Sequence, residues 1–170
     1  MVAYIPGKLG EFLDRLRAEL VPGCKLRSHV SVLPPRPSRS TGDGCAASLR
    51  YDVTRLAPVP IKAGAVSVFA KTGVVYLEVA SGSEELLSMH SLLNVGDLAF
   101  TEEYSYHPHI TLAQNFDPSL LNAIQELATG RWNEFDGERG FLMDRLTFVR
   151  NDGSNGWLDI AECPLANAGR

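Results

Sequence analysis

Two short segments about half a chain apart repeat one order of side chains: a histidine, a β-branched apolar residue, a hydroxyl residue and another apolar residue. The first is His29-Val30-Ser31-Val32 and the second is His109-Ile110-Thr111-Leu112. Such alternation with a period of two is typical of a half-buried β-strand. Each histidine and its hydroxyl partner then project from the same face, about 6.5–7 Å apart, and the apolar residues project from the other. The fold must therefore provide two half-buried strands, one in each half of the chain.

The rest of the chain alternates between strand-like and helix-like stretches. Apolar residues recur at three- and four-residue steps between Lys8 and Leu20, as in an amphipathic helix, and the prolines from Pro34 to Pro37 end the first histidine strand. We expect strands over residues 2–5, 26–33, 61–70, 74–80, 106–113, 141–150 and 157–161, and helices over residues 8–20, 45–56, 83–93 and from 117 onward. This order predicts one α+β domain over residues 1–170, built of two related lobes with sheet at the centre.

Two of these elements allow a more detailed prediction. Asp117 followed by Pro118 is a typical helix start, with aspartate as the cap and proline at the first helical position. We expect this helix to bury Leu120, Leu121, Ile124 and Leu127. The last two strands, over residues 141–150 and 157–161, are expected to form a hairpin.

Composition limits the class of protein. The chain has 170 residues, of which 45% are apolar and 21% charged, as in an ordinary globular protein that buries a core. Its three cysteines are scattered, which argues against a disulfide framework and a cysteine-based zinc site. No apolar stretch approaches the ~18 residues that span a bilayer, and no signal-peptide pattern is present, so we expect a cytoplasmic protein without a membrane partner. The net charge of −4 argues against broad adhesion to nucleic acid, but not against a nucleotide site.

The paired histidines and hydroxyls suit chemistry on a phosphate ester. In-line displacement at phosphorus needs a base for the attacking oxygen and an acid for the leaving oxygen, on opposite sides. An imidazole with its ordinary pKa can take either role near neutral pH. Hydroxyl groups can donate hydrogen bonds to the non-bridging oxygens, where charge accumulates in the transition state. Two such strands facing each other across a cleft would place acid and base around one phosphorus without requiring a metal ion.

One histidine followed two residues later by serine or threonine is common by chance, but two copies in matching strands are much more informative. With its flanking residues the pattern resembles the 2H phosphoesterase superfamily, and within it the branch named 2′-5′ RNA ligase-like. The resemblance covers almost the whole chain. It rests on His29–Val32 with the turn Pro34–Pro37, on Val68-Phe69 with Val74–Val79, on Tyr106–Ala113, and on the closing hairpin from Leu146–Arg150 to Trp157.

The resemblance implies a single bilobal domain with pseudo-twofold symmetry, in which two antiparallel-rich sheets flank a central cleft and helices lie outside. It implies a metal-independent phosphodiesterase that acts on 2′,3′-cyclic or 2′-5′ phosphodiester bonds of nucleotides or RNA ends. His29 and His109 would be the acid and the base, and Ser31 and Thr111 would hold the phosphate. Arg36, in the proline turn, is a further candidate phosphate contact through its guanidinium fork. No cofactor, metal ion or obligate protein partner is implied, and a monomer is expected.

Two positions depart from the pattern of this family. Ser31 stands where the commonest motif has threonine, but it keeps the hydroxyl, so we expect the function to be kept. Gln114 follows the second motif where many relatives carry a basic residue. The protein should therefore bind a polyanionic chain more weakly than these relatives do, which favours a small nucleotide over long RNA as the substrate.

Three other interpretations stay open. His107 lies two residues before His109 on the same face, and with His29 it could complete a three-histidine metal site of a hydrolase. The same fold could bind a nucleotide or RNA without turnover, and ligation could occur on the same residues.

Arg27 shares the face of His29 and is either a phosphate contact or a surface residue. Other conspicuous side chains are expected to be structural: His90 in a helix, and Phe69, Tyr76, Tyr106 and Trp157 in the core.

Overall fold

The computed structural model describes residues 1–37, 53–153 and 156–166. The strands are β1 (Val2–Tyr4), β2 (His29–Ser31), β3 (Val59–Val68), β4 (Val75–Ser81), β5 (His109–Ala113), β6 (Gly140–Met143), β7 (Arg145–Asn151) and β8 (Trp157–Pro164). The helices are α1 (Gly7–Leu20), α3 (Ser83–Leu93) and α4 (Leu121–Glu134), with short 3-10 turns η1 (Gly96–Leu98) and η2 (Pro118–Leu120). Most of the helix expected over residues 45–56 lies outside the described residues.

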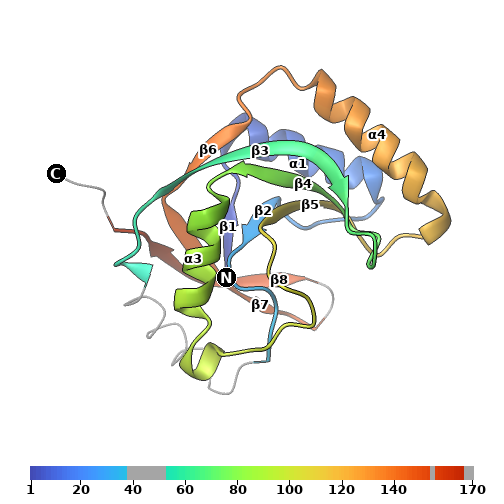
Figure 1. Cartoon of the computed structure of the whole chain (residues 1–170). Coiled ribbons are helices and arrows are strands. Elements are labelled where there is room, and N and C mark those ends of the chain that lie inside the picture. Colours follow the sequence, from blue (N-terminus) through green and yellow to red (C-terminus); the bar gives the residue numbers. More distant parts are fainter. Residues whose placement is uncertain (38–52, 154–155, 167–170) are drawn as a thin grey trace.

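The eight strands form one antiparallel sheet in the order β6-β3-β4-β5-β2-β1-β7-β8. Figure 1 shows the sheet as a curved surface, with α1 and α4 side by side and α3 apart from them. The α+β class and the antiparallel pairing are therefore confirmed, but the two sheets that we expected are two halves of one sheet. The strands of the two histidine motifs, β5 and β2, are its central pair. The pseudo-twofold symmetry stays a prediction.

The stretch expected to form one strand over residues 141–150 forms two strands instead. β6 pairs with β3 at one edge of the sheet, whereas β7 pairs with β1 and β8 at the other side. Asp144 lies at the break between them and is exposed. The expected hairpin of the last two strands is confirmed, with Asn151 opposite Trp157. Local periodicity missed the break because the residues on both sides of Asp144 are themselves strand-like.

The apolar face of α1 packs into the single hydrophobic cluster of the described residues. Its buried leucines recur at helical spacing, as predicted, at Leu9, Leu13, Leu16 and Leu20. Gly10 lies on the same face. A Cβ atom at this position would come within 2.0 Å of the Ile5 carbonyl oxygen. Only glycine therefore lets the first turns of α1 pass so close to the end of β1.

The buried face predicted for α4 is wrong in part. Asp117 does cap this region, because its carboxylate accepts a hydrogen bond from the Ser119 N–H, but the chain first makes the 3-10 turn η2. Leu120, which lies in this turn, and Leu127 are 49% and 39% exposed. The buried residues of α4 are Ile124, Ala128 and Trp132. Across residues 1–37, 53–153 and 156–166, none of the helices combines the length and the apolar composition that crossing a bilayer requires.

Candidate active site

The four motif side chains lie together at the centre of the sheet. Val30 on β2 is opposite Ile110 on β5 in an antiparallel pair, and both are fully buried. This register places His29 opposite Thr111 and Ser31 opposite His109, with all four on the other face. We had expected the two strands to face each other across a cleft, but they are direct neighbours in one sheet.

The four motif side chains surround one point on this face of the sheet. Directly opposite residues of an antiparallel pair have Cβ atoms about 4.5–5.5 Å apart, and diagonal residues are about 7–8 Å apart. His29 and His109 occupy one diagonal of this square, and Ser31 and Thr111 occupy the other. A tetrahedral group above the centre therefore meets an imidazole on two opposite sides and a hydroxyl on the other two.

Both imidazoles are oriented by the same local hydrogen bond. The Nδ1–H of His29 donates to the Arg27 carbonyl oxygen at 2.7 Å, and the Nδ1–H of His109 donates to the His107 carbonyl oxygen at 2.7 Å. A carbonyl oxygen can only accept, so Nδ1 carries the proton in each ring. The Nε2 atom of each neutral ring then carries a lone pair and is available as a base.

Their surroundings lower the proton affinity of both rings. Burial is the main reason that the pKa of His29 falls from its usual 6.5 to about 4, and the nearby Arg17 guanidinium lowers it further. Burial also lowers the pKa of His109, and His107 adds to this effect, whereas the Glu78 carboxylate acts in the opposite direction. Both rings are therefore neutral near pH 7 in the ligand-free protein. A bound phosphate anion favours the charged imidazolium and raises both pKa values.

The chain matches a known family over most of its length. A family model described as the 2′-5′ RNA ligase superfamily matches residues 5–155. The chain belongs to this superfamily of 2H phosphoesterases. It is 29% identical over 116 residues to a protein of Bacillus licheniformis named as a candidate phosphoesterase, and the match covers 67% of this chain and 69% of that protein.

Solved structures of other proteins share the fold of this chain. A crystal structure of a phosphoesterase superposes with a TM-score of 0.65 at 14% identity, covering 98% of this chain and 96% of its own. E. coli LigT, solved in complex with phosphate, gives a TM-score of 0.62 at 16% identity, covering 98% and 95% of the two chains. LigT has also been solved in complex with NADP+, with the same similarity to this chain. The family model thus confirms the family resemblance of the sequence, and these structures confirm the fold.

Within this 2H phosphoesterase, the structure does not support Arg36 as a phosphate contact. Its guanidinium donates to the Pro34 carbonyl, the Asn94 side chain, the Leu98 carbonyl and the Glu102 carboxylate. The Arg36 side chain is only 5% exposed, and these bonds use four of its five N–H donors. In the ligand-free structure Arg36 thus holds together the segments that follow β2 and precede β5, and its role as a phosphate contact stays a prediction.

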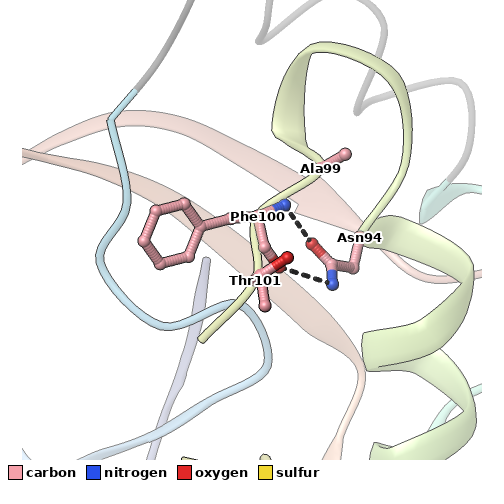
Figure 2. A pocket seen from close by; sticks show the side chains of 4 residues that line it. All are labelled: Asn94, Ala99, Phe100 and Thr101. Carbon is pink, nitrogen blue, oxygen red and sulfur yellow. Dashed lines mark hydrogen bonds between the residues drawn. The ribbon is translucent and has the colours of Figure 1, made fainter. Parts of the chain in front are cut away.

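Asn94, which accepts a hydrogen bond from Arg36, also binds the main chain of Phe100. Its amide both accepts from the Phe100 N–H and donates to the Phe100 carbonyl, as Figure 2 shows. These two residues line a shallow depression of about 430 Å³ together with Ala99 and Thr101. The depression is therefore a surface feature of the loop between α3 and β5, and its lining contains none of the four motif residues.

His107 is engaged by a carboxylate that the sequence did not reveal. Its Nε2 lies 3.1 Å from Glu78 Oε2, and Glu78 comes from the neighbouring strand β4. The sequence around His107 could not reveal Glu78, because Glu78 belongs to a different strand. In the parts of the chain that the structure describes, no group of three or more histidine, cysteine, aspartate or glutamate side chains is placed to hold a metal ion.

Aromatic rings beside His109 were expected only as core. Phe69 stacks on Tyr76 with ring centroids 4.0 Å apart, and both rings meet His109 edge-on, at 5.0 and 5.4 Å. Tyr76 is indeed only 4% exposed. Its register opposite Thr111 makes it a wall of the site as well as a core residue, which strand alternation alone could not reveal.

The surroundings of His29 are more polar. The Tyr4 ring meets His29 edge-on at 6.3 Å, and the Arg27 guanidinium lies 3.7 Å above the Tyr4 ring. Asp159 accepts from the Tyr4 hydroxyl at 2.6 Å and lies 3.6 Å from Arg27. A depression of about 370 Å³ begins here and runs between β1, β7 and β8. Arg27 is thus paired on the surface.

Arg17 is the residue that sequence reasoning missed altogether. It is 2% exposed, it donates to the Thr111 carbonyl oxygen through Nη1, and its Nη2 lies 3.8 Å from Cys24 Sγ. Within the described residues no carboxylate pairs with it, and its Nε has no hydrogen-bond partner. A signal was present in the sequence, because Arg17 shares the apolar face of α1 with Leu13 and Leu20 at helical spacing.

Proposed function

We propose that this chain is a metal-independent phosphodiesterase that acts on 2′,3′-cyclic or 2′-5′ phosphodiester bonds of nucleotides or RNA ends. His29 and His109 act as general acid and base, and Ser31 and Thr111 hold the phosphate. The observation that carries the proposal is the square of alternating imidazoles and hydroxyls formed by the register of β2 and β5. Membership of the 2′-5′ RNA ligase superfamily supports the class of bond.

The chemistry follows from the placement of the two rings. The phosphate lies over the centre of the square, and the hydroxyls of Ser31 and Thr111 donate to its non-bridging oxygens. The Nε2 atom of one neutral imidazole takes a proton from the attacking water as the new P–O bond forms. The other ring, protonated in the complex, gives its proton to the departing ribose oxygen as that P–O bond breaks. The same steps in reverse describe ligation.

A protonated ring in the complex is consistent with the lowered pKa values of the free protein. Burial keeps both imidazoles neutral at pH 7 without substrate. The negative phosphate offsets that effect when it binds between them, so one proton is taken up together with the substrate. Binding and acid catalysis are therefore coupled, and the rate should fall when the pH is too high to supply that proton.

The walls of the site favour a nucleotide of limited size. The partly exposed Phe69 ring, stacked on the buried Tyr76 beside His109, and the Tyr4 ring on the side of His29 offer aromatic surfaces on both sides of the phosphate. Such surfaces suit nucleobases. The neutral Gln114 and the net charge of −4 weaken the attraction for a long polyanion. LigT, which shares the fold, has been solved with phosphate and with NADP+.

The decisive experiment measures turnover of 2′,3′-cyclic nucleotides and 2′-5′-linked dinucleotides with and without a chelator. Loss of a general acid or base should reduce kcat by roughly 10²–10⁴-fold in His29→Ala and in His109→Ala. His107→Ala is the matched control, because His107 contributes its main-chain carbonyl to His109, and that carbonyl remains. Turnover that survives in the two alanine variants, or that the chelator abolishes, would refute this mechanism.

A non-catalytic nucleotide-binding module is the second candidate. The observation in its favour is that both imidazoles are neutral at pH 7 in the ligand-free protein, so that the acid appears only with a ligand. Calorimetric titration with the same compounds, followed by product analysis, separates the two. Binding without product would support the module, and product would support the enzyme.

A further inference from the structure

A buried charged cluster lies outside the motif square. Glu102 Oε1 accepts from Arg36 Nη2 at 2.6 Å, and Glu102 Oε2 lies 3.3 Å from His90 Nε2. The side chains of Arg36, His90 and Glu102 are only 5%, 9% and 18% exposed. Burying such groups costs free energy unless each is well paired. The three residues come from the segment after β2, from α3 and from the loop before β5, so the cluster joins the surroundings of both motifs.

The cluster fixes the ring of His90 on all sides. His90 Nδ1 donates to the Val32 carbonyl oxygen at 2.8 Å, at the end of the first motif. Its ring also stacks on Tyr106, with centroids 4.0 Å apart and an angle of 11° between the planes. Tyr106 is therefore stacked on a ring whose Nδ1 is hydrogen-bonded and whose Nε2 lies against the Glu102 carboxylate.

The hydroxyl of Tyr106 reaches the other motif. It donates to the Ser31 carbonyl oxygen at 2.8 Å, and Ser31 is the residue opposite His109 in the register of β2 and β5. Tyr106 precedes His109 by three residues on the same chain segment. Val30 opposite Ile110 is the one strand pair recorded between β2 and β5 in the described residues. The tyrosine hydroxyl thus supplies a second tie between the two motifs, at the main chain of the proposed phosphate ligand.

We propose that Tyr106 is a positioning residue, clamped by His90 and the Glu102–Arg36 pair, that fixes the main chain of Ser31 so that its hydroxyl meets the phosphate beside His109. The inference rests on the proposed function of the motif square. It assigns to Tyr106 no contact with the substrate. Its effect passes through Ser31, and not through Thr111, which is on the other strand.

Tyr106→Phe removes only the hydroxyl and tests this assignment. We expect roughly a tenfold loss of kcat on a 2′,3′-cyclic nucleotide, the size of one neutral hydrogen bond. Tyr104→Phe is the matched control, because Tyr104 lies in the same loop and is 46% exposed. This variant should turn over the substrate at the wild-type rate. The melting temperature of each variant is measured beside its activity.

A double-mutant cycle separates positioning from a general loss of stability. In a Ser31→Ala background the added Tyr106→Phe change should alter kcat less than about twofold, because the hydroxyl that it positions is gone. In a Thr111→Ala background it should keep its full effect of roughly tenfold. Equal effects in all three backgrounds, or no effect in the wild type, would overturn the proposal.

The same set of variants is also tested for binding of inorganic phosphate. This measurement tests the positioning role of Tyr106 separately from the proposed phosphodiesterase activity. The dissociation constant for phosphate is measured by calorimetry for each variant, with no turnover needed. If no substrate is turned over but phosphate binding weakens in Tyr106→Phe only when Ser31 is present, positioning holds and the phosphodiesterase proposal fails. If the wild type neither turns over any substrate nor binds phosphate, both are overturned.

Discussion

The strands β2 and β5 carry the same motif, but the histidines on them have different neighbours. Both imidazoles donate from Nδ1 to the carbonyl two residues earlier, at the same distance of 2.7 Å. His29 lies in the field of the buried Arg17 from α1, whereas His109 lies against the Phe69 and Tyr76 rings and near the His107–Glu78 pair. Ring orientation is therefore set by the local chain, and proton affinity is set by elements far away in sequence.

Nearby charged side chains also act in opposite directions on the two imidazoles. Arg17 disfavours the protonated form of His29, and Glu78 favours the protonated form of His109. His109 should therefore accept a proton before His29 as the pH falls or as a phosphate binds. The two copies of one motif are thus unequal, although their sequences and backbone geometry are alike.

The largest expected effect tests whether the two hydroxyls are equivalent. Removing one preorganised donor to a developing charge costs roughly 10²–10³-fold in kcat, so Ser31→Ala and Thr111→Val should each lose about that much. Thr111→Ser keeps the hydroxyl and should stay close to the wild type. Steady-state kinetics on a 2′,3′-cyclic nucleotide makes the measurement. A loss in one variant alone would show that only one strand holds the phosphate.

The next effect is on stability at acidic pH. The pKa of His29 is about 4 in the folded protein and returns to about 6.5 on unfolding, so its contribution to stability is complete above pH 6.5. That contribution is lost as the pH falls from 6.5 through 4, which lowers the free energy of unfolding by roughly 1–3 kcal/mol. Urea unfolding across this range should therefore show a smaller fall for His29→Asn than for the wild type. His109→Asn should reduce the fall less, and an equal reduction would contradict the inequality of the two rings.

The smallest effects are shifts of single pKa values, followed by NMR of the imidazole protons. Arg17→Met should raise the pKa of His29, because it removes the buried cation, and leave that of His109 in place. Arg15→Met is its control, since Arg15 is exposed on the same helix. Glu78→Gln should lower the pKa of His109 and leave that of His29 in place. If both histidines respond to either change, the two environments are not separate.

Local patterns predicted the elements and the faces of this fold. Alternation of side chains placed His29 and Ser31, and His109 and Thr111, on one face of each strand, because a strand repeats every two residues whatever its neighbours are. The leucine spacing likewise identified α1. These are properties of the chain itself, and the structure contains both of them.

The neighbours of each strand could not be predicted in this way. Nothing local states that β6 pairs with β3 at the far edge of the sheet, or that β2 and β5 lie side by side. The sequence also did not show that Glu102, distant along the chain, would bind Arg36. Glu78 beside His107 was missed for the same reason. Long-range pairing depends on how whole surfaces pack, so it is invisible in a window of a few residues.

The central position of the β2–β5 pair has a consequence for how such a protein can change over generations. Each half of the sheet contributes one imidazole and one hydroxyl, so the spacing that matters is a relation between the halves and belongs to neither alone. Under the proposed mechanism, neither half produced as a separate fragment could hold a phosphate between acid and base. A substitution that shifts one half is tolerated only when the other half shifts with it. Compensating pairs of substitutions across this boundary are therefore the expected mark of divergence among proteins that keep the site.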